Sequence, residues 1–206
     1  MKRARGFTLV EMLVVVAIFG GIMGALLISF LVGKSSYLSA DAYIQVQQET
    51  RRAFDNMVKE LREAGGTITP ADVTSTSLTF QVALGYNLAA PCPVNAVCWG
   101  AQDQNGANQP GWSIRYRVNG TQLVRELHNE IPPIDPPVAT RVLANNANSG
   151  LAADGLPATS WRYDSGTKVV NMRLEVRQVS GQLPGGSMST SPPAPLRTQV
   201  RLRNTS

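Results

Sequence analysis

Residues 6–32 read GFTLVEMLVVVAIFGGIMGALLISFLV and form a long apolar stretch near the N-terminus. From Met12 to Val32 no residue carries a charge. A helix over this range is about as long as the hydrocarbon core of a bilayer is thick, roughly 30 Å. We therefore expect the chain to cross a membrane once, close to its N-terminus.

Basic residues are concentrated on one side of this segment. Lys2, Arg3 and Arg5 precede it, whereas Lys34 and Asp41 follow it and cancel in charge. Because short cytosolic segments next to a membrane span are enriched in Lys and Arg, we expect the N-terminus in the cytosol and everything after residue 33 outside it. The formal net charge of +5 therefore belongs largely to the N-terminal end and says little about what the rest of the chain binds.

Other kinds of N-terminal apolar segment fit this sequence less well. A secretory signal has a shorter apolar region that ends at a small-residue cleavage site, whereas this segment leads into a further helical pattern. A lipid-anchored protein has a cysteine directly after its signal, and the first cysteine here is Cys92. A membrane anchor of unspecified function remains an alternative.

The apolar segment begins with residues 6–13, GFTLVEML, and Arg3 and Arg5 precede it. This sequence closely resembles the recognition motif of type IV prepilins and pseudopilins of bacteria. The resemblance implies cleavage between Gly6 and Phe7 by a prepilin peptidase, methylation of the new Phe7 amine, and assembly with other pilin or pseudopilin subunits at an inner-membrane platform. It implies neither catalytic activity nor a cofactor.

The residue types in the motif suit this processing. Gly6 has no side chain to obstruct a protease at the scissile bond. Glu11 lies next to the apolar span, where a carboxylate costs about 2–3 kcal/mol and needs a partner. Cleavage would place the Phe7 amine one helical turn before Glu11 on the same face, and the resemblance implies that Glu11 pairs with this amine of a neighbouring subunit. A glutamate that only reaches the lipid headgroups is the alternative.

The helical pattern continues beyond the membrane to Ala64 and is predicted to end at Gly65-Gly66. Residues at spacings of three and four recur along this part: Ala40, Ile44, Gln47, Arg51, Phe54, Val58 and Leu61. The last three, together with Met57, form an apolar stripe that we expect to cover a sheet.

The remainder of the chain has the period-two alternation of β-strands. Alternating apolar positions predict strands at Leu78–Leu84, Trp112–Val118, Val170–Val176 and Leu196–Leu202. Asn119-Gly120 predicts a two-residue hairpin turn after the second of these strands. This turn would pair Tyr116 with Leu123 and set Arg125 opposite Ile114, where it is the one exception to an apolar face.

Together these elements predict an α+β fold in which a long N-terminal helix packs on an antiparallel β-sheet head. We expect four parts: a leader peptide (1–6), a membrane and assembly half of the helix (7–32), an amphipathic half (33–64) and a β-rich head outside the cytosol (65–206). Three polar or proline-rich loops are expected in the head, at residues 100–111, 129–137 and 180–195.

The chain contains two cysteines and one histidine. Disulfides form outside the cytosol, so we predict a bridge between Cys92 and Cys98. With His128 these give three candidate ligands, too few for a four-ligand zinc site without a carboxylate, and the acidic residues lack the spacing of a calcium loop. We therefore expect no metal, and we expect His128, near a strand end, to be a surface or edge residue.

Weaker resemblances extend over the rest of the chain. Residues 51–62, Trp161–Asp164 and residues 198–204 resemble W-type minor pilins and the J-type pseudopilins of type II secretion systems. They imply a minor subunit of an envelope filament, with a J-type pseudopilin as the alternative within the family. A bitopic membrane receptor or enzyme is the alternative from a different class.

Arginines alternate with the apolar residues of the predicted strands and would share the opposite face of the sheet. They are Arg115, Arg117, Arg173, Arg177, Arg197, Arg201 and Arg203. Such a stripe could bind the phosphates of DNA or another anionic surface. The alternative is a solvated face whose arginines pair with a neighbouring subunit.

Overall fold

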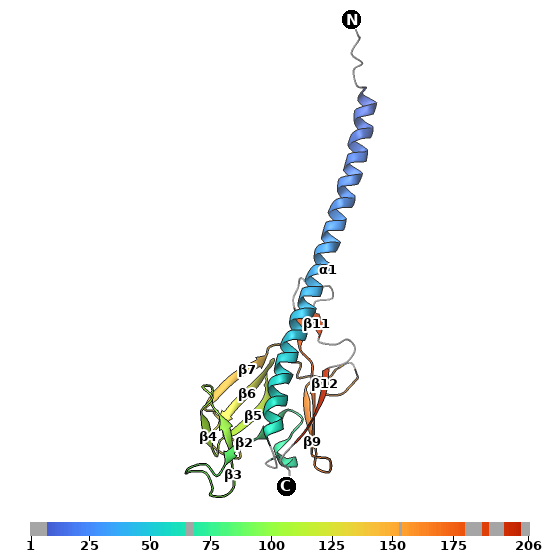
Figure 1. Cartoon of the computed structure of the whole chain (residues 1–206). Helices are drawn as coiled ribbons and strands as arrows, with labels where there is room; N and C mark the ends of the chain where they lie inside the picture. Colours follow the sequence, from blue (N-terminus) through green and yellow to red (C-terminus); the bar gives the residue numbers. More distant parts are fainter. Residues whose placement is uncertain (1–7, 65–67, 153, 180–186, 190–195, 203–206) are drawn as a thin grey trace.

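The computed structural model describes residues 8–64, 68–152, 154–179, 187–189 and 196–202. A long helix, α1 (Leu9–Glu63), projects from a head of antiparallel strands (Figure 1). The C-terminal part of α1 lies along the strands, and its N-terminal part extends away from them. The predicted α+β fold is thus confirmed. Among the residues singled out above, those outside the described residues are Lys2, Arg3, Arg5, Gly6, Phe7, Gly65, Gly66 and Arg203.

The ends of α1 follow from local capping. Thr8 is the N-cap residue: its side chain accepts a hydrogen bond from the Glu11 backbone, and the Glu11 side chain accepts one from the Thr8 backbone. This reciprocal capping box satisfies two amides that a helix start leaves without partners. At the other end Ala64 is the C-cap, and its amide bonds the carbonyl of Leu61.

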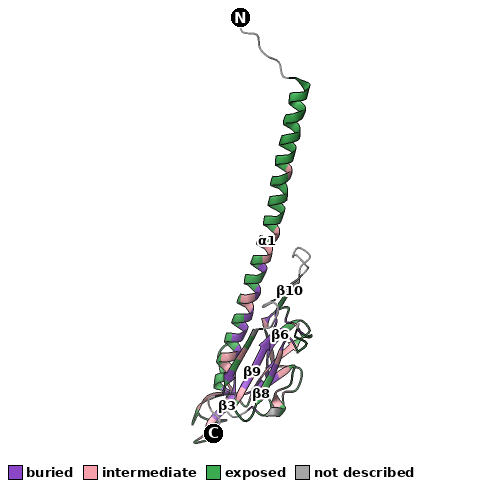
Figure 2. Ribbon diagram, turned by 90° about the vertical axis from the view of Figure 1, so that its right-hand side faces the viewer, coloured by how far each residue is buried: buried purple, intermediate pink, exposed green. Residues whose placement is uncertain are grey.

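Burial divides α1 into two parts (Figure 2). From Leu9 to Asp41 no side chain is buried. The buried positions are Ala42, Val46, Thr50, Ala53, Phe54, Met57 and Leu61. The predicted apolar stripe of Phe54, Met57, Val58 and Leu61 is therefore confirmed.

The helical spacing through Ala40, Ile44 and Gln47, before the stripe, does not mark the buried face, because Ile44 is 52% exposed. The buried face instead passes through Ala42, Val46 and Thr50, and it continues to Ala53 at helical spacing. A shift of two residues moves a position by about half a turn around a helix, so Ile44 lies on the side opposite the buried one.

Two sheets carry the main body of the head. The first is four-stranded, in the order β1-β5-β6-β7, and the second is three-stranded, in the order β12-β9-β8. The bounds of the first are β1 (Ser77–Phe80), β5 (Ser113–Asn119), β6 (Gln122–His128) and β7 (Ala139–Ala144). Those of the second are β8 (Ser160–Asp164), β9 (Val169–Leu174) and β12 (Leu196–Arg201).

Smaller elements complete the head. A 3-10 helix, η2 (Pro70–Asp72), precedes β1, and a small sheet has the order β2-β3-β4. Its strands are β2 (Val82–Tyr86), β3 (Val97–Gln102) and β4 (Asn108–Pro110). A short ribbon pairs β10 (Arg177–Val179) with β11 (Ser187–Ser189).

The predicted strand Leu78–Leu84 is divided between two sheets. Phe80 pairs with Ile114 of the first sheet, whereas Val82 pairs with Gly100 of the small sheet. The chain changes partner at Gln81, whose side chain donates a hydrogen bond to the Trp112 carbonyl. One alternating sequence therefore contributes a strand to each of two sheets, β1 to the first sheet and β2 to the small one.

The β5–β6 hairpin forms as predicted but in another register. Tyr116 is opposite Arg125, and Ile114 is opposite Leu127. The two-residue loop is Gly120-Thr121, with φ of 60° at Gly120, because a loop with glycine at its first central position matches the twist of the flanking strands. The difference of two positions keeps the same side chains on the same face.

The helix and the inner faces of both sheets enclose a common apolar core. Met57 and Leu61 of α1 meet Phe80 and Ile114 of the first sheet and Trp161 of the second within this core. The head is therefore built around the C-terminal part of α1, and the N-terminal part of the helix contributes nothing to it.

Candidate functional site

The first turn of α1 holds a carboxylate at the start of the apolar segment. Glu11 Oε2 accepts hydrogen bonds from the Thr8 backbone amide at 2.8 Å and from the Thr8 hydroxyl at 2.9 Å. Negative charge is favourable at this end of a helix, where amides are unpaired and the helix dipole is positive. The geometry fixes the Glu11 carboxylate against Thr8, the residue that would follow the first residue of a processed chain.

The surface that follows Glu11 is apolar and uncovered. Large side chains such as Leu13, Phe19, Leu26 and Phe30 are between 58% and 69% exposed. Among the helices that the structure describes, α1 is the one long and apolar enough to cross a membrane, and none of its most apolar stretch is buried inside the protein. Exposed apolar surface of this extent requires a bilayer or other protein chains around it.

A comparison with protein families bears directly on this segment. Residues 1–30 match the family described as the prokaryotic N-terminal methylation motif. This N-terminal segment is that of a type IV pilin-like, prepilin-type protein. The match spans the predicted processing site, the Thr8–Glu11 cap and most of the exposed apolar surface.

Neither the comparison with curated proteins nor that with solved structures gives a match. These comparisons therefore supply no relative from which a role for the head could be transferred. Its resemblance to W-type minor pilins and J-type pseudopilins stays a prediction, and its sites must be assessed from its own residues.

The junction between α1 and the first sheet contains a polar cluster that sequence reasoning missed. Glu60 of α1 accepts a hydrogen bond from the Tyr116 hydroxyl, and Arg125 Nε donates to Glu60 Oε1 at 2.9 Å. Burial, and then the nearby Glu60 carboxylate, raise the pKa of Tyr116 well above its usual value, so its hydroxyl stays a donor. The signal was present in the sequence, since Arg125 interrupts an apolar face.

The predicted disulfide is confirmed. Cys92 and Cys98 are bonded, with their Cα atoms 5.2 Å apart. The bridge ties the segment after β2 to strand β3 of the small sheet. It closes a short loop, which restricts the unfolded chain and stabilises this corner of the head.

The arginines of β5 are ion-paired. Arg115 and Arg117 donate through their Nε atoms to the two oxygens of Glu126, each at 2.8 Å. Arg115 also bonds Asp135, and chiefly for this reason the pKa of Asp135 is lowered. Glu126 is 1% exposed, so these two members of the predicted arginine face hold a buried carboxylate in place.

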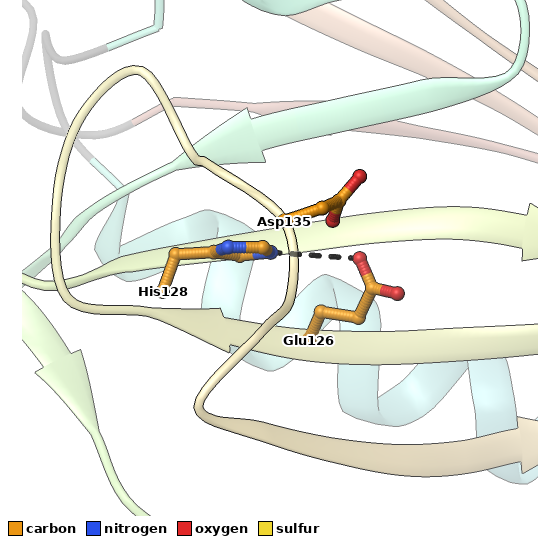
Figure 3. Close-up of side chains that lie close together, drawn as sticks. All are labelled: Glu126, His128 and Asp135. Atoms are coloured by element: carbon orange, nitrogen blue, oxygen red, sulfur yellow. Dashed lines mark ion pairs between the residues drawn. The ribbon is translucent and has the colours of Figure 1, made fainter.

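His128 is buried at 1% exposure, so the expected surface or edge position is wrong. The loop between β6 and β7 folds over it: His128 Nδ1 lies 3.0 Å from the Ile134 carbonyl, and Nε2 lies 3.5 Å from Glu126 Oε2 (Figure 3). Its ligand atom and those of Glu126 and Asp135 lie within 4.8 Å of one another. Both carboxylates already pair with arginines, so a cation there would face two guanidinium groups, and we assign no metal to this group.

The arginines of the second sheet have fewer acidic partners. Arg173 of β9 and Arg197 of β12 both bond Asp154, and Arg201 is exposed on β12. Arg177 is exposed on β10 and lies 3.4 Å from Glu175. Those predicted arginines that the structure describes are therefore distributed over the two main sheets and the β10–β11 ribbon, and they do not form one continuous stripe.

Proposed function

We propose that this protein is a minor subunit of a bacterial envelope filament, with a structural and not an enzymatic role. It is cleaved between Gly6 and Phe7 by a prepilin peptidase and methylated on the Phe7 amine. Residues 7–32 hold it in the inner membrane before assembly, with the head on the periplasmic side, and then pack among other subunits in the filament.

The division of α1 carries this proposal. The half that bears the methylation motif is apolar and uncovered, whereas the half after Asp41 is built into the head. A subunit that first resides in a bilayer and then enters a helical filament needs such a half, because its apolar side chains exchange lipid for neighbouring subunits. Glu11, fixed in the first turn by Thr8, would then pair with the Phe7 amine of a neighbour during entry.

Glu11→Ala tests this proposal. We expect cleavage to proceed and incorporation into filaments to fall, because the amine of the neighbouring subunit loses its partner. The measurement compares the protein in sheared filaments with that in membranes. Glu63→Ala is the matched control, since it removes an exposed glutamate from the other end of α1. Equal incorporation of the Glu11 variant and the wild type would contradict the pairing role.

A J-type pseudopilin of a type II secretion system is the second candidate, because residues 51–62 and 198–204 resemble J-type pseudopilins as well as W-type minor pilins. Deletion of the gene distinguishes the two. Loss of surface filaments with normal secretion of exoproteins supports the minor pilin. Retention of exoproteins inside the cell with unchanged surface filaments supports the pseudopilin.

A further inference from the structure

A cleft lies on the outer face of the second sheet, remote from the N-terminal motif. Its volume is about 790 Å³. Residues of all three strands form its floor, and the loop residues Leu156 and Pro157 and the turn residue Ser165 form its sides. Three arginines line it, namely Arg162, Arg173 and Arg197.

The strand register explains why these side chains meet. Ser160, Arg173 and Arg197 are cross-strand neighbours and form one row across β8, β9 and β12. Arg162, Asn171 and Gln199 form the next row on the same face. Neighbouring strands lie about 4.8 Å apart and alternate residues about 7 Å apart along a strand, so the two rows present guanidinium and amide groups side by side.

One carboxylate of the protein itself already lies against this floor. Asp154 Oδ1 accepts from Arg173 Nη2 at 2.5 Å, and Oδ2 accepts from Arg197 Nη2 at 2.9 Å. Hydrogen bonding from Arg173 is the main reason that the pKa of Asp154 is lowered, so Asp154 stays ionised. The two guanidiniums are thus spaced to share a carboxylate.

The cleft retains positive charge and unused donors. Within the described part of the chain, the cleft has three arginines but only two nearby carboxylates, those of Asp154 and of the lining residue Asp164. Arg173 is 9% exposed, and its Nε finds no acceptor among the described residues. The first sheet differs, because Arg115 and Arg117 there are matched by Glu126 and Asp135.

We propose that this cleft binds an acidic segment of another polypeptide, with an Asp or Glu side chain engaging Arg162 and Arg197. Asp154 supports a peptide carboxylate as the ligand, because a carboxylate of the protein itself already bonds Arg197 and the neighbouring Arg173. Asn171 and Gln199 offer amide donors and acceptors that match a peptide backbone. This role is independent of filament entry through Glu11.

The test uses the full chain in non-ionic detergent and a short fluorescein-labelled peptide of alternating glutamate and glycine. Fluorescence anisotropy should show binding that weakens as salt rises. Arg162→Ala and Arg197→Ala should each weaken it about tenfold, the range expected for a charged hydrogen bond. Arg197 has a side chain 60% exposed, so its removal leaves the fold intact.

Two comparisons make the result specific. Arg141→Ala removes an exposed arginine of β7, outside the cleft, and should leave binding unchanged. Asp154→Asn should strengthen binding, because it removes the internal carboxylate that competes for Arg197. Equal weakening by Arg141→Ala, equal binding of a glutamine–glycine peptide, or tighter binding of duplex DNA than of the peptide would each overturn the proposal.

Discussion

The two halves of α1 belong to one continuous helix yet differ in what surrounds their apolar side chains. Met23, in the N-terminal half, is 44% exposed, whereas Met57, in the C-terminal half, is 1% exposed. At the N-terminal end a methionine is thus available to contact lipid or other subunits. At the C-terminal end the same residue type is buried and stabilises the head. Apolar side chains that a fold leaves uncovered indicate where its function lies.

The largest expected effect concerns the start of the uncovered half. Gly6→Val should block maturation, because a branched side chain would stand at the scissile bond. The electrophoretic mobility of the protein from cells with active prepilin peptidase reports this. Gly33→Val is the control, since open space surrounds a side chain added at Gly33. Full processing of the Gly6 variant would show that this peptide bond is not the one cleaved.

The methionine pair tests the comparison between the halves directly. Met57→Ala should lower the free energy of unfolding of the head by about 2–5 kcal/mol, since it creates a cavity in the core. Met23→Ala should change it by less than about 0.5 kcal/mol, as for other exposed positions. Urea unfolding in detergent, followed by tryptophan fluorescence, provides both values. Equal losses would mean that the N-terminal half also supports the head.

A smaller effect is expected where the C-terminal half meets the first sheet. Glu60→Ala should cost about 1–3 kcal/mol, because Arg125 and Tyr116 lose their shared acceptor. Glu63→Ala removes an exposed glutamate less than one turn further on and should be nearly neutral. The same urea titration separates them, and a neutral Glu60→Ala would show that the junction depends on apolar packing alone.

The smallest effect concerns acid stability of the head. The arginine partners Arg115 and Arg173 lower the pKa of Asp135 and Asp154 in the folded state. These carboxylates therefore stabilise the fold above their unfolded pKa, about 3.9, and the contribution is lost as pH falls through the lower folded pKa. Asp135→Asn should lower the urea midpoint at pH 7 and approach the wild type in strong acid. A constant difference across pH would contradict the ion pair as its cause.

Much of this architecture follows from local sequence pattern. The apolar run up to Val32 and the motif around Glu11 predicted the helix and the family, since both depend on neighbouring residues. Alternation likewise predicted strands close to β5, β9 and β12. Strands β3 and β7 were missed because their sequences lack a clean alternation, and β8 because its alternation spans only five residues.

The parts that the sequence did not predict depend on contacts between distant residues. Glu60 and Arg125 are 65 positions apart, and only the packing of α1 on β6 brings them together. His128 is buried because the following loop returns over it and places the Ile134 carbonyl beside the ring. The cleft on the second sheet depends on the register of β8, β9 and β12, which no single strand specifies.

The proposed processing would make Phe7 the first residue of the mature chain, directly before the uncovered half of α1. Intact-mass measurement of the protein extracted from membranes of cells with active prepilin peptidase tests it most directly. We expect a chain that starts at Phe7 and is heavier than residues 7–206 by CH2, the net gain when a methyl group replaces one hydrogen of the amine. A chain that retains Met1 and the leader residues would contradict it.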